Sequence, residues 1–106
     1  MPSAKIDLTT TGDLIAAHAS PTAFIRVHGF TVSADGAGTG RFEDDDGVVY
    51  SGLASAAGSN ATSADYTELG HFDLPAGKKL QFVVAGGSPR FLGHVAYSYR
   101  NVPLGV

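Results

Sequence analysis

The stretch FIRVHGFTV, residues 24–32, decides the fold class of this chain. Apolar, β-branched and aromatic residues dominate it, and Pro21 and Gly36 bound it, which is typical of a β-strand. With a period of two, the side chains of one face are Phe24, Arg26, His28, Phe30 and Val32, and those of the other are Ile25, Val27, Gly29 and Thr31. The stretch therefore predicts one strand that keeps this alternation throughout.

Strand patterns continue on both sides of this stretch. KLQFVVA (79–85) and RFLGHVAYSY (90–99) alternate in the same way, and shorter candidates cover residues 4–9, 13–18, 39–43, 47–51 and 67–73. Turn sequences such as ASPT at 19–22 and LPAGKK at 74–79 separate them. About eight short strands without a helix-length amphipathic segment predict an all-β fold, a single antiparallel β-sandwich of the jelly-roll-like kind.

Two parts of the chain fit this pattern less well. Residues 51–65, SGLASAAGSNATSAD, are small and polar, and we interpret them as a long loop or a loosely held edge, with a short helical turn at Leu53 to Ala57 as an alternative. Residues 1–12 are interpreted as a polar, extended N-terminal arm that could pair with a neighbour's sheet edge. The sandwich domain is then expected at residues 13–106.

Composition sets limits on function. The 106 residues fit one domain, and the absence of cysteine excludes disulfides, thiol catalysis and thiolate zinc sites. Charged residues make up 16%, the net charge is −3, and Lys78 and Lys79 are the only adjacent basic pair, so nucleic-acid binding is not expected. The chain has no apolar run of about 18 residues, and its N-terminus lacks a continuous apolar segment, so we expect neither a membrane span nor a secretory signal.

The acidic run in GRFEDDDGVVYSG, residues 40–52, is the first candidate for chemistry. Its four carboxylates, residues 43–46, do not fit a calcium loop of the EF-hand type, because Phe42 and Leu53 would occupy ligand positions. Asp-Gly between apolar runs instead predicts the tip of a hairpin. A weak surface cation site is the alternative, with the candidate ligands Asp44, Asp45 and Asp46.

The other polar motifs predict no active site. No two of the four histidines have a metal-ligand spacing, and His28 and His94 are expected to be partly buried, hydrogen-bonded members of strands. The glycines of ADGAGTG, residues 34–40, lack the spacing of a dinucleotide or phosphate loop. No serine lies in a Gly-x-Ser-x-Gly elbow. We therefore expect that the chain is not an enzyme and uses no cofactor.

The order of these patterns resembles a family of small phage and prophage virion structural proteins. The resemblance covers roughly residues 20–100 and lies in turn and core positions. The matching residues are Ile25, Arg26, Val27, Phe42, Gly47, Gly70, Phe72, Ala76, Gly77, Leu80, Gly93 and Tyr97. The chain departs from the family pattern at the acidic hairpin, where a Ser/Gly-rich turn is usual.

The resemblance implies a capsid decoration, or cement, protein that binds the assembled capsid surface of a phage and stabilises it. The implied partner is the major capsid protein, the expected homo-oligomer is a trimer, and the expected location is the capsid surface of virions made in the host cytoplasm. Interface candidates are Lys5, Ile6, Leu8, Tyr97, Tyr99 and Arg100.

The alternative function is a carbohydrate- or receptor-binding module of a phage head fibre or tail. Such a module would use exposed aromatic rings, for which the candidates are Tyr50, Tyr66, Tyr97 and Tyr99. Rings gathered in an open groove would favour sugar binding. Rings in the core or at a subunit interface would favour capsid decoration.

Overall fold

A computed structural model describes residues 3–36, 38–55, 59–86 and 90–101, and these residues form nine strands and no helix. The strands are β1 (Ser3–Leu8), β2 (Gly12–Ile15), β3 (Ala23–Asp35), β4 (Gly38–Asp44), β5 (Val49–Ser55), β6 (Ser59–Ala64), β7 (Phe72–Asp73), β8 (Leu80–Ala85) and β9 (Arg90–Asn101). No helix that could cross a membrane occurs in this described part of the chain.

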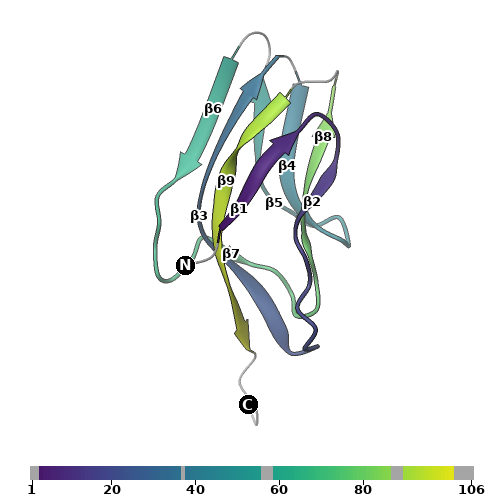
Figure 1. The fold of residues 1–106 in the computed structure, drawn as a ribbon, viewed down its shortest axis with the longest axis vertical. Helices are drawn as coiled ribbons and strands as arrows, with labels where there is room; N and C mark the ends of the chain where they lie inside the picture. Colours follow the sequence, from purple (N-terminus) through teal and green to yellow (C-terminus); the bar gives the residue numbers. More distant parts are fainter. Residues whose placement is uncertain (1–2, 37, 56–58, 87–89, 102–106) are drawn as a thin grey trace.

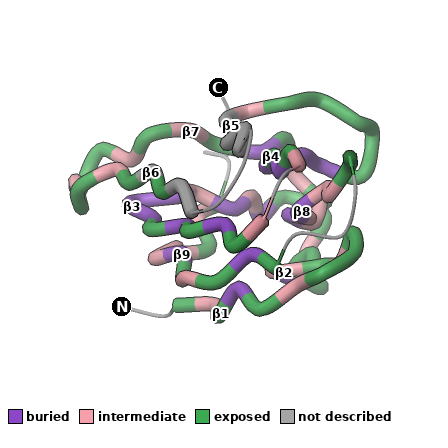
Figure 2. The backbone as a smooth tube through the Cα atoms, turned by 90° about the horizontal axis from the view of Figure 1, so that it is seen from above, coloured by how far each residue is buried: buried purple, intermediate pink, exposed green. Residues whose placement is uncertain are grey.

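The strands form two antiparallel sheets. The five-stranded sheet has the order β1-β9-β3-β6, with the short β7 also paired to β3, and the four-stranded sheet has the order β2-β8-β4-β5. The two sheets lie face to face, as the views in Figures 1 and 2 show. The prediction of an all-β, antiparallel sandwich is therefore confirmed, with β1 and β9 together at one side of the larger sheet.

Aromatic rings fill the space between the sheets. Phe42 and Phe82 lie 5.1 Å apart in an edge-on contact, and Phe82 makes the same kind of contact with Phe91, also at 5.1 Å. All three side chains are fully buried. Gly40 lies beneath them, because a Cβ atom there would come within 2.3 Å of the Phe82 ring. A glycine therefore occupies this inward-facing position of β4, two residues before Phe42, because the rings leave no room for a side chain.

Strand β3 changes the set of residues that it buries part-way along its length. The buried apolar residues are Ala23, Ile25 and Val27 in the first half, and Phe30, Val32 and Ala34 in the second. The register against β9 shifts between Val27 and Gly29, where His28 is the extra residue of a β-bulge. One extra residue inverts the alternation, so the expectation of an unbroken alternation across residues 24–32 is wrong.

Residues 51–65 are more regular than we expected. β5 runs on to Ser55, and β6 pairs with β3 from Ser59 opposite Asp35 to Ala64 opposite Phe30. The loop interpretation is therefore wrong for the described residues, while the position of β6 at the end of its sheet agrees with an edge. The helical turn proposed from Leu53 is wrong as far as Ser55, and Ala56 and Ala57 lie outside the described residues. The stretch 67–73, by contrast, is less regular than expected, because only Phe72–Asp73 form a strand, β7.

The N-terminal arm also needs correction. Residues 3–8 form β1, which pairs with β9 along its whole length. Ile6 is completely buried, and Ala4 and Leu8 pack against the same core. Their spacing of two residues places all three on the inner face of the strand. Residues 3–8 therefore belong to the sandwich itself.

Candidate functional site

The acidic run forms the tip of the β4–β5 hairpin, as its Asp-Gly sequence predicts. The Gly47 N–H donates to the Asp44 carbonyl at 3.1 Å, and Gly47 has a φ of +84°, which glycine adopts without strain. The Asp44 carboxylate is fully buried beneath this turn. It accepts hydrogen bonds from the N–H groups of Asp46 at 2.8 Å and Val48 at 3.1 Å, and from the Tyr50 hydroxyl at 2.9 Å. Asp44 therefore holds the tip in one conformation.

Two of the three remaining carboxylates of the run form ion pairs. Glu43 is buried against Arg41, with which it forms an ion pair, and Asp46 forms an ion pair with Lys78 at 2.9 Å. Asp45 is exposed. Nowhere in the described residues do three or more His, Asp or Glu side chains gather as metal ligands would. The structure therefore does not bring Asp44, Asp45 and Asp46 together as a cation site.

We expect the substitution Asp44→Asn to destabilise the protein by about 1–3 kcal/mol at neutral pH, because a buried donor loses its charged acceptor. Burial raises the pKa of Asp44, but the hydrogen bonds from Val48, Tyr50 and Asp46 outweigh burial, and the pKa lies below its ordinary value. A lowered pKa stabilises the folded state above the ordinary carboxyl pKa of about 4, and this stability is lost as the pH falls through the folded value.

Urea denaturation between neutral and acidic pH measures this effect. The difference between the wild-type protein and the Asp44→Asn variant should shrink as the pH falls below about 4, and it should be lost once the pH passes below the lowered pKa of Asp44 in the folded protein, where the carboxylate is protonated. The matched control is Asp45→Asn in the same turn, whose side chain is exposed and which should change stability by at most about 0.5 kcal/mol. Equal stability of the two variants at neutral pH would contradict the role of Asp44.

A second polar cluster surrounds the β-bulge. His28 is completely buried, and its Nδ1 lies 2.9 Å from the Thr67 carbonyl, which can only accept a hydrogen bond. Nδ1 therefore carries the proton in the neutral ring, and Nε2 accepts from the Ser98 hydroxyl at 2.7 Å. Arg100 donates its Nε–H to the same hydroxyl at 3.0 Å. The expectation of a buried, hydrogen-bonded strand histidine is confirmed for His28, while His94 is exposed.

A serine that donates to a histidine is also the pairing used in nucleophilic catalysis. In this cluster the ring of His28 is fully buried and stacks on the Tyr66 ring, with 5.5 Å between the ring centroids. The nitrogen that faces away from Ser98, Nδ1, is bonded to the Thr67 backbone carbonyl. The Thr67 N–H in turn donates to the His28 carbonyl at 2.9 Å. These contacts hold the connection between β6 and β7 against β3 and β9, so the cluster has a structural role.

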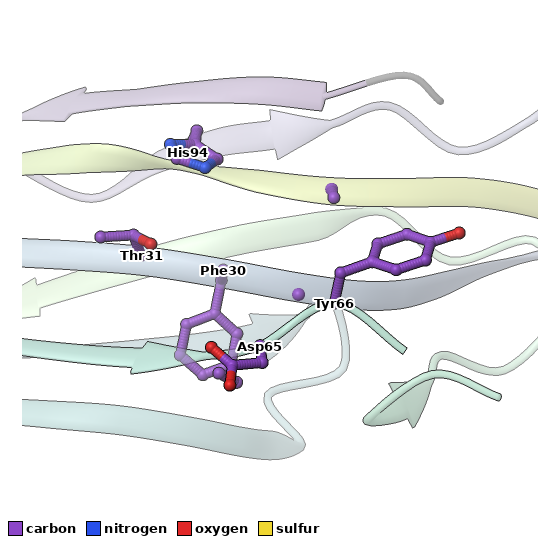
Figure 3. A pocket seen from close by; sticks show the side chains of 8 residues that line it. Phe30, Thr31, Asp65, Tyr66 and His94 are labelled. Atoms are coloured by element: carbon purple, nitrogen blue, oxygen red, sulfur yellow. The ribbon is translucent and has the colours of Figure 1, made fainter. Parts of the chain in front are cut away.

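A hollow of about 200 Å³ opens beside this cluster on the outer face of the five-stranded sheet (Figure 3). Its lining residues are Gly29, Phe30, Thr31, Ala64, Asp65, Tyr66, His94 and Ala96. The chain after β6 crosses β3 closely here, since a Cβ atom on Gly29 would lie 3.1 Å from the backbone of Tyr66. Thr31 and His94 face each other on neighbouring strands. The hollow thus offers a hydroxyl, a carboxylate, an imidazole and, besides the buried Phe30, the exposed ring of Tyr66.

The four tyrosines do not share this hollow. Tyr50 stacks on Phe72 at 5.0 Å, and Tyr97 packs against the core and meets Tyr99 edge-on at 5.6 Å. The Tyr99 hydroxyl donates to the Ala16 carbonyl at 2.7 Å. Among the four, only Tyr66 lines the hollow. Tyr66 stacks on His28 and its hydroxyl donates to Glu68 at 2.7 Å, so all four rings are held by contacts within the domain.

The interface candidates differ in how accessible they are. Ile6 is buried in the core and is not available to a partner. Leu8, Tyr97 and Arg100 are half-buried, whereas Lys5 and Tyr99 are exposed.

The sequence did not predict the hollow or the partners of Asp44, because both depend on which strands become neighbours.

No protein-family model, curated protein or solved structure matches this chain. The resemblance to phage virion proteins therefore stays a prediction.

Proposed function

We propose that this protein is a capsid decoration protein of a phage, acting as a structural component rather than as an enzyme. The observation that supports this proposal most is the placement of the tyrosines. Tyr50 and Tyr97 pack against the core and Tyr99 is tied to Ala16, so the rings do not gather in one open groove as a sugar-binding platform requires.

The proposed mechanism is binding to the assembled shell. The partner is the major capsid protein, the location is the outer surface of the capsid, and copies are proposed to cluster as trimers where capsid subunits meet. An interface of standard size would bury about 800 Å² on each partner. Because the protein binds the assembled shell and not free subunits, binding stabilises the shell by mass action. The rigid hairpin tip fits this role, since a preformed surface loses little entropy on binding.

The alternative is a carbohydrate- or receptor-binding module, and one feature favours it. The hollow combines Tyr66, which is 49% exposed, with the side chains of Asp65 and His94. A ring face beside hydrogen-bonding groups is the usual composition of a small-ligand pocket. One exposed ring, that of Tyr66, and a hollow of about 200 Å³ provide less stacking surface than the tyrosine row expected for this function.

Binding to purified particles tests the proposal. We expect the protein to co-sediment saturably with mature capsids that lack it, and to raise the temperature at which those capsids fall apart. Binding should depend on the assembled shell, so unassembled capsid protein is the control. Co-sedimentation with tails alone, or retention on immobilised glycans without capsid binding, would overturn the proposal in favour of the alternative.

A further inference from the structure

The outer edge of β1 is an open strand edge. β1 lies at the end of its sheet, and among the described residues it pairs with β9 alone (Figure 2). In an antiparallel ladder, alternate residues direct their N–H and C=O groups to the neighbouring strand, and the others direct them to the open side. The open side of β1 is therefore a template for one more strand.

The charges on β1 are complementary to those of a second, antiparallel β1. Lys5 and Asp7 lie two residues apart and are both exposed, on the outer face of the strand. If the pairing is centred on Ile6, Lys5 of each copy faces the other copy's Asp7, which gives two interchain ion pairs. A register centred on Lys5 or on Asp7 would instead place like charges opposite each other, which is unfavourable. Registers shifted by one residue would place the core face of the second copy on the opposite side of the shared sheet, so the apolar layers of the two copies would not be continuous.

Both charged residues are able to make this contact. Lys5 forms no ion pair within the described part of the chain. Asp7 accepts hydrogen bonds from the Arg90 guanidinium at 3.1 and 3.2 Å. A carboxylate has about four lone-pair sites, so Asp7 can accept a lysine ammonium as well. An Arg90–Asp7–Lys5 chain of alternating charge would then span the two copies.

The inner face of β1 is self-complementary too. In the register centred on Ile6, Leu8 of one copy lies opposite Ala4 of the other, so a large side chain faces a small one. Both residues are half-buried and already pack at the margin of the core. Pairing would cover this margin and continue the apolar layer from one copy to the next.

We propose that two copies of this chain associate through their β1 edges, antiparallel and centred on Ile6. A lone lysine on an edge strand normally prevents such pairing, but here Asp7 compensates for it. The strand of the other sheet on this side, β2, is a poorer template, with four residues and a register shift after Asp13. In this register residues 4–8 of the two strands pair, and such a short ladder buries less than a standard interface, so the association is weak and reversible. It does not depend on the proposed capsid function or on its trimer.

Sedimentation equilibrium of the full chain, up to about 1 mM, tests this proposal. The wild-type protein should show reversible dimerisation. The single variants Lys5→Glu and Asp7→Lys should each dimerise at least about tenfold more weakly, because each places like charges opposite one another twice. An equimolar mixture of the two variants should recover the wild-type affinity, since the heterodimer restores an ion pair at both positions.

The matched control is Lys79→Glu, a reversal of the same charge on a residue that pairs with Asp13 of the other sheet. This variant should dimerise like the wild-type protein, and circular dichroism should show that every variant is folded. A wild-type monomer at the highest concentration would overturn the proposal. It would also be overturned if Lys5→Glu dimerised normally, or if the mixture failed to recover. None of these results involves capsids, so they are separate from a failure of the proposed function.

Discussion

Replacing Gly93 with alanine is expected to prevent folding. A Cβ atom at this position would lie 1.8 Å from the Thr31 carbonyl oxygen and 3.1 Å from the Val32 Cα. These are backbone atoms of β3, and Gly93 also pairs with Ile6 of β1 on its other side. Neither neighbouring strand can withdraw without breaking the ladder that joins them. The cost of the clash should therefore cancel most or all of the free energy of unfolding, which is about 5–15 kcal/mol for a typical domain.

The matched control is Gly77→Ala. Gly77 has a φ of +79°, but no atom lies within 4 Å of the added Cβ. This variant isolates the backbone strain of a non-glycine residue, which costs about 1–2 kcal/mol. Thermal and urea denaturation of both variants give the comparison. A Gly93→Ala variant that is as stable as Gly77→Ala would show that β3 and β9 do not approach as closely as described.

Deleting residues 1–8 is expected to have the second-largest effect. The deletion removes β1, leaves one backbone edge of β9 unpaired, and takes away Ile6, which is fully buried. Truncating one buried isoleucine to alanine costs about 2–5 kcal/mol by itself, and the loss of a whole strand adds the hydrogen bonds to β9. We therefore expect a chain with little cooperative unfolding and poor dispersion of its NMR signals.

A substitution in the same strand provides the control for this deletion. Lys5→Ala leaves β1 in place and removes only an exposed side chain, so in dilute protein its stability should stay within about 0.5 kcal/mol of the wild type. If the truncated chain instead unfolds cooperatively at the wild-type temperature, residues 1–8 are an arm after all. That outcome would also remove the basis for dimerisation through β1.

Sequence patterns predicted the strands whose burial follows a simple alternation. β8 and most of β9 are of this kind, because every second residue faces the core. β6 was not predicted as a strand, because its sequence SNATSA has no apolar alternation and it is held by backbone pairing to β3. For β1 the pattern of Ala4, Ile6 and Leu8 was visible, but the surrounding polar residues suggested an arm.

The sites were harder to predict because they depend on contacts between strands. Asp44, Asp45 and Asp46 are the same residue type in one turn, and only the register of β4 against β5 decides which of them is buried. The hollow likewise needs the crossing of the chain over Gly29, which follows from the pairing of β6. A single sequence contains the residues of these sites but not the register that brings them together.

The β-bulge at His28 has a consequence for how relatives of this chain can differ in length. A residue inserted or deleted elsewhere in β3 would invert the burial of everything between that point and the bulge or the strand end. Length changes in this strand would therefore be eliminated by selection unless a second change restored the alternation. Connections such as residues 16–22, which lie between β2 and β3 and contain no buried residue, can vary without this penalty. In this fold the spacing from His28 to each end of β3 is therefore expected to evolve more slowly than the residues that occupy it.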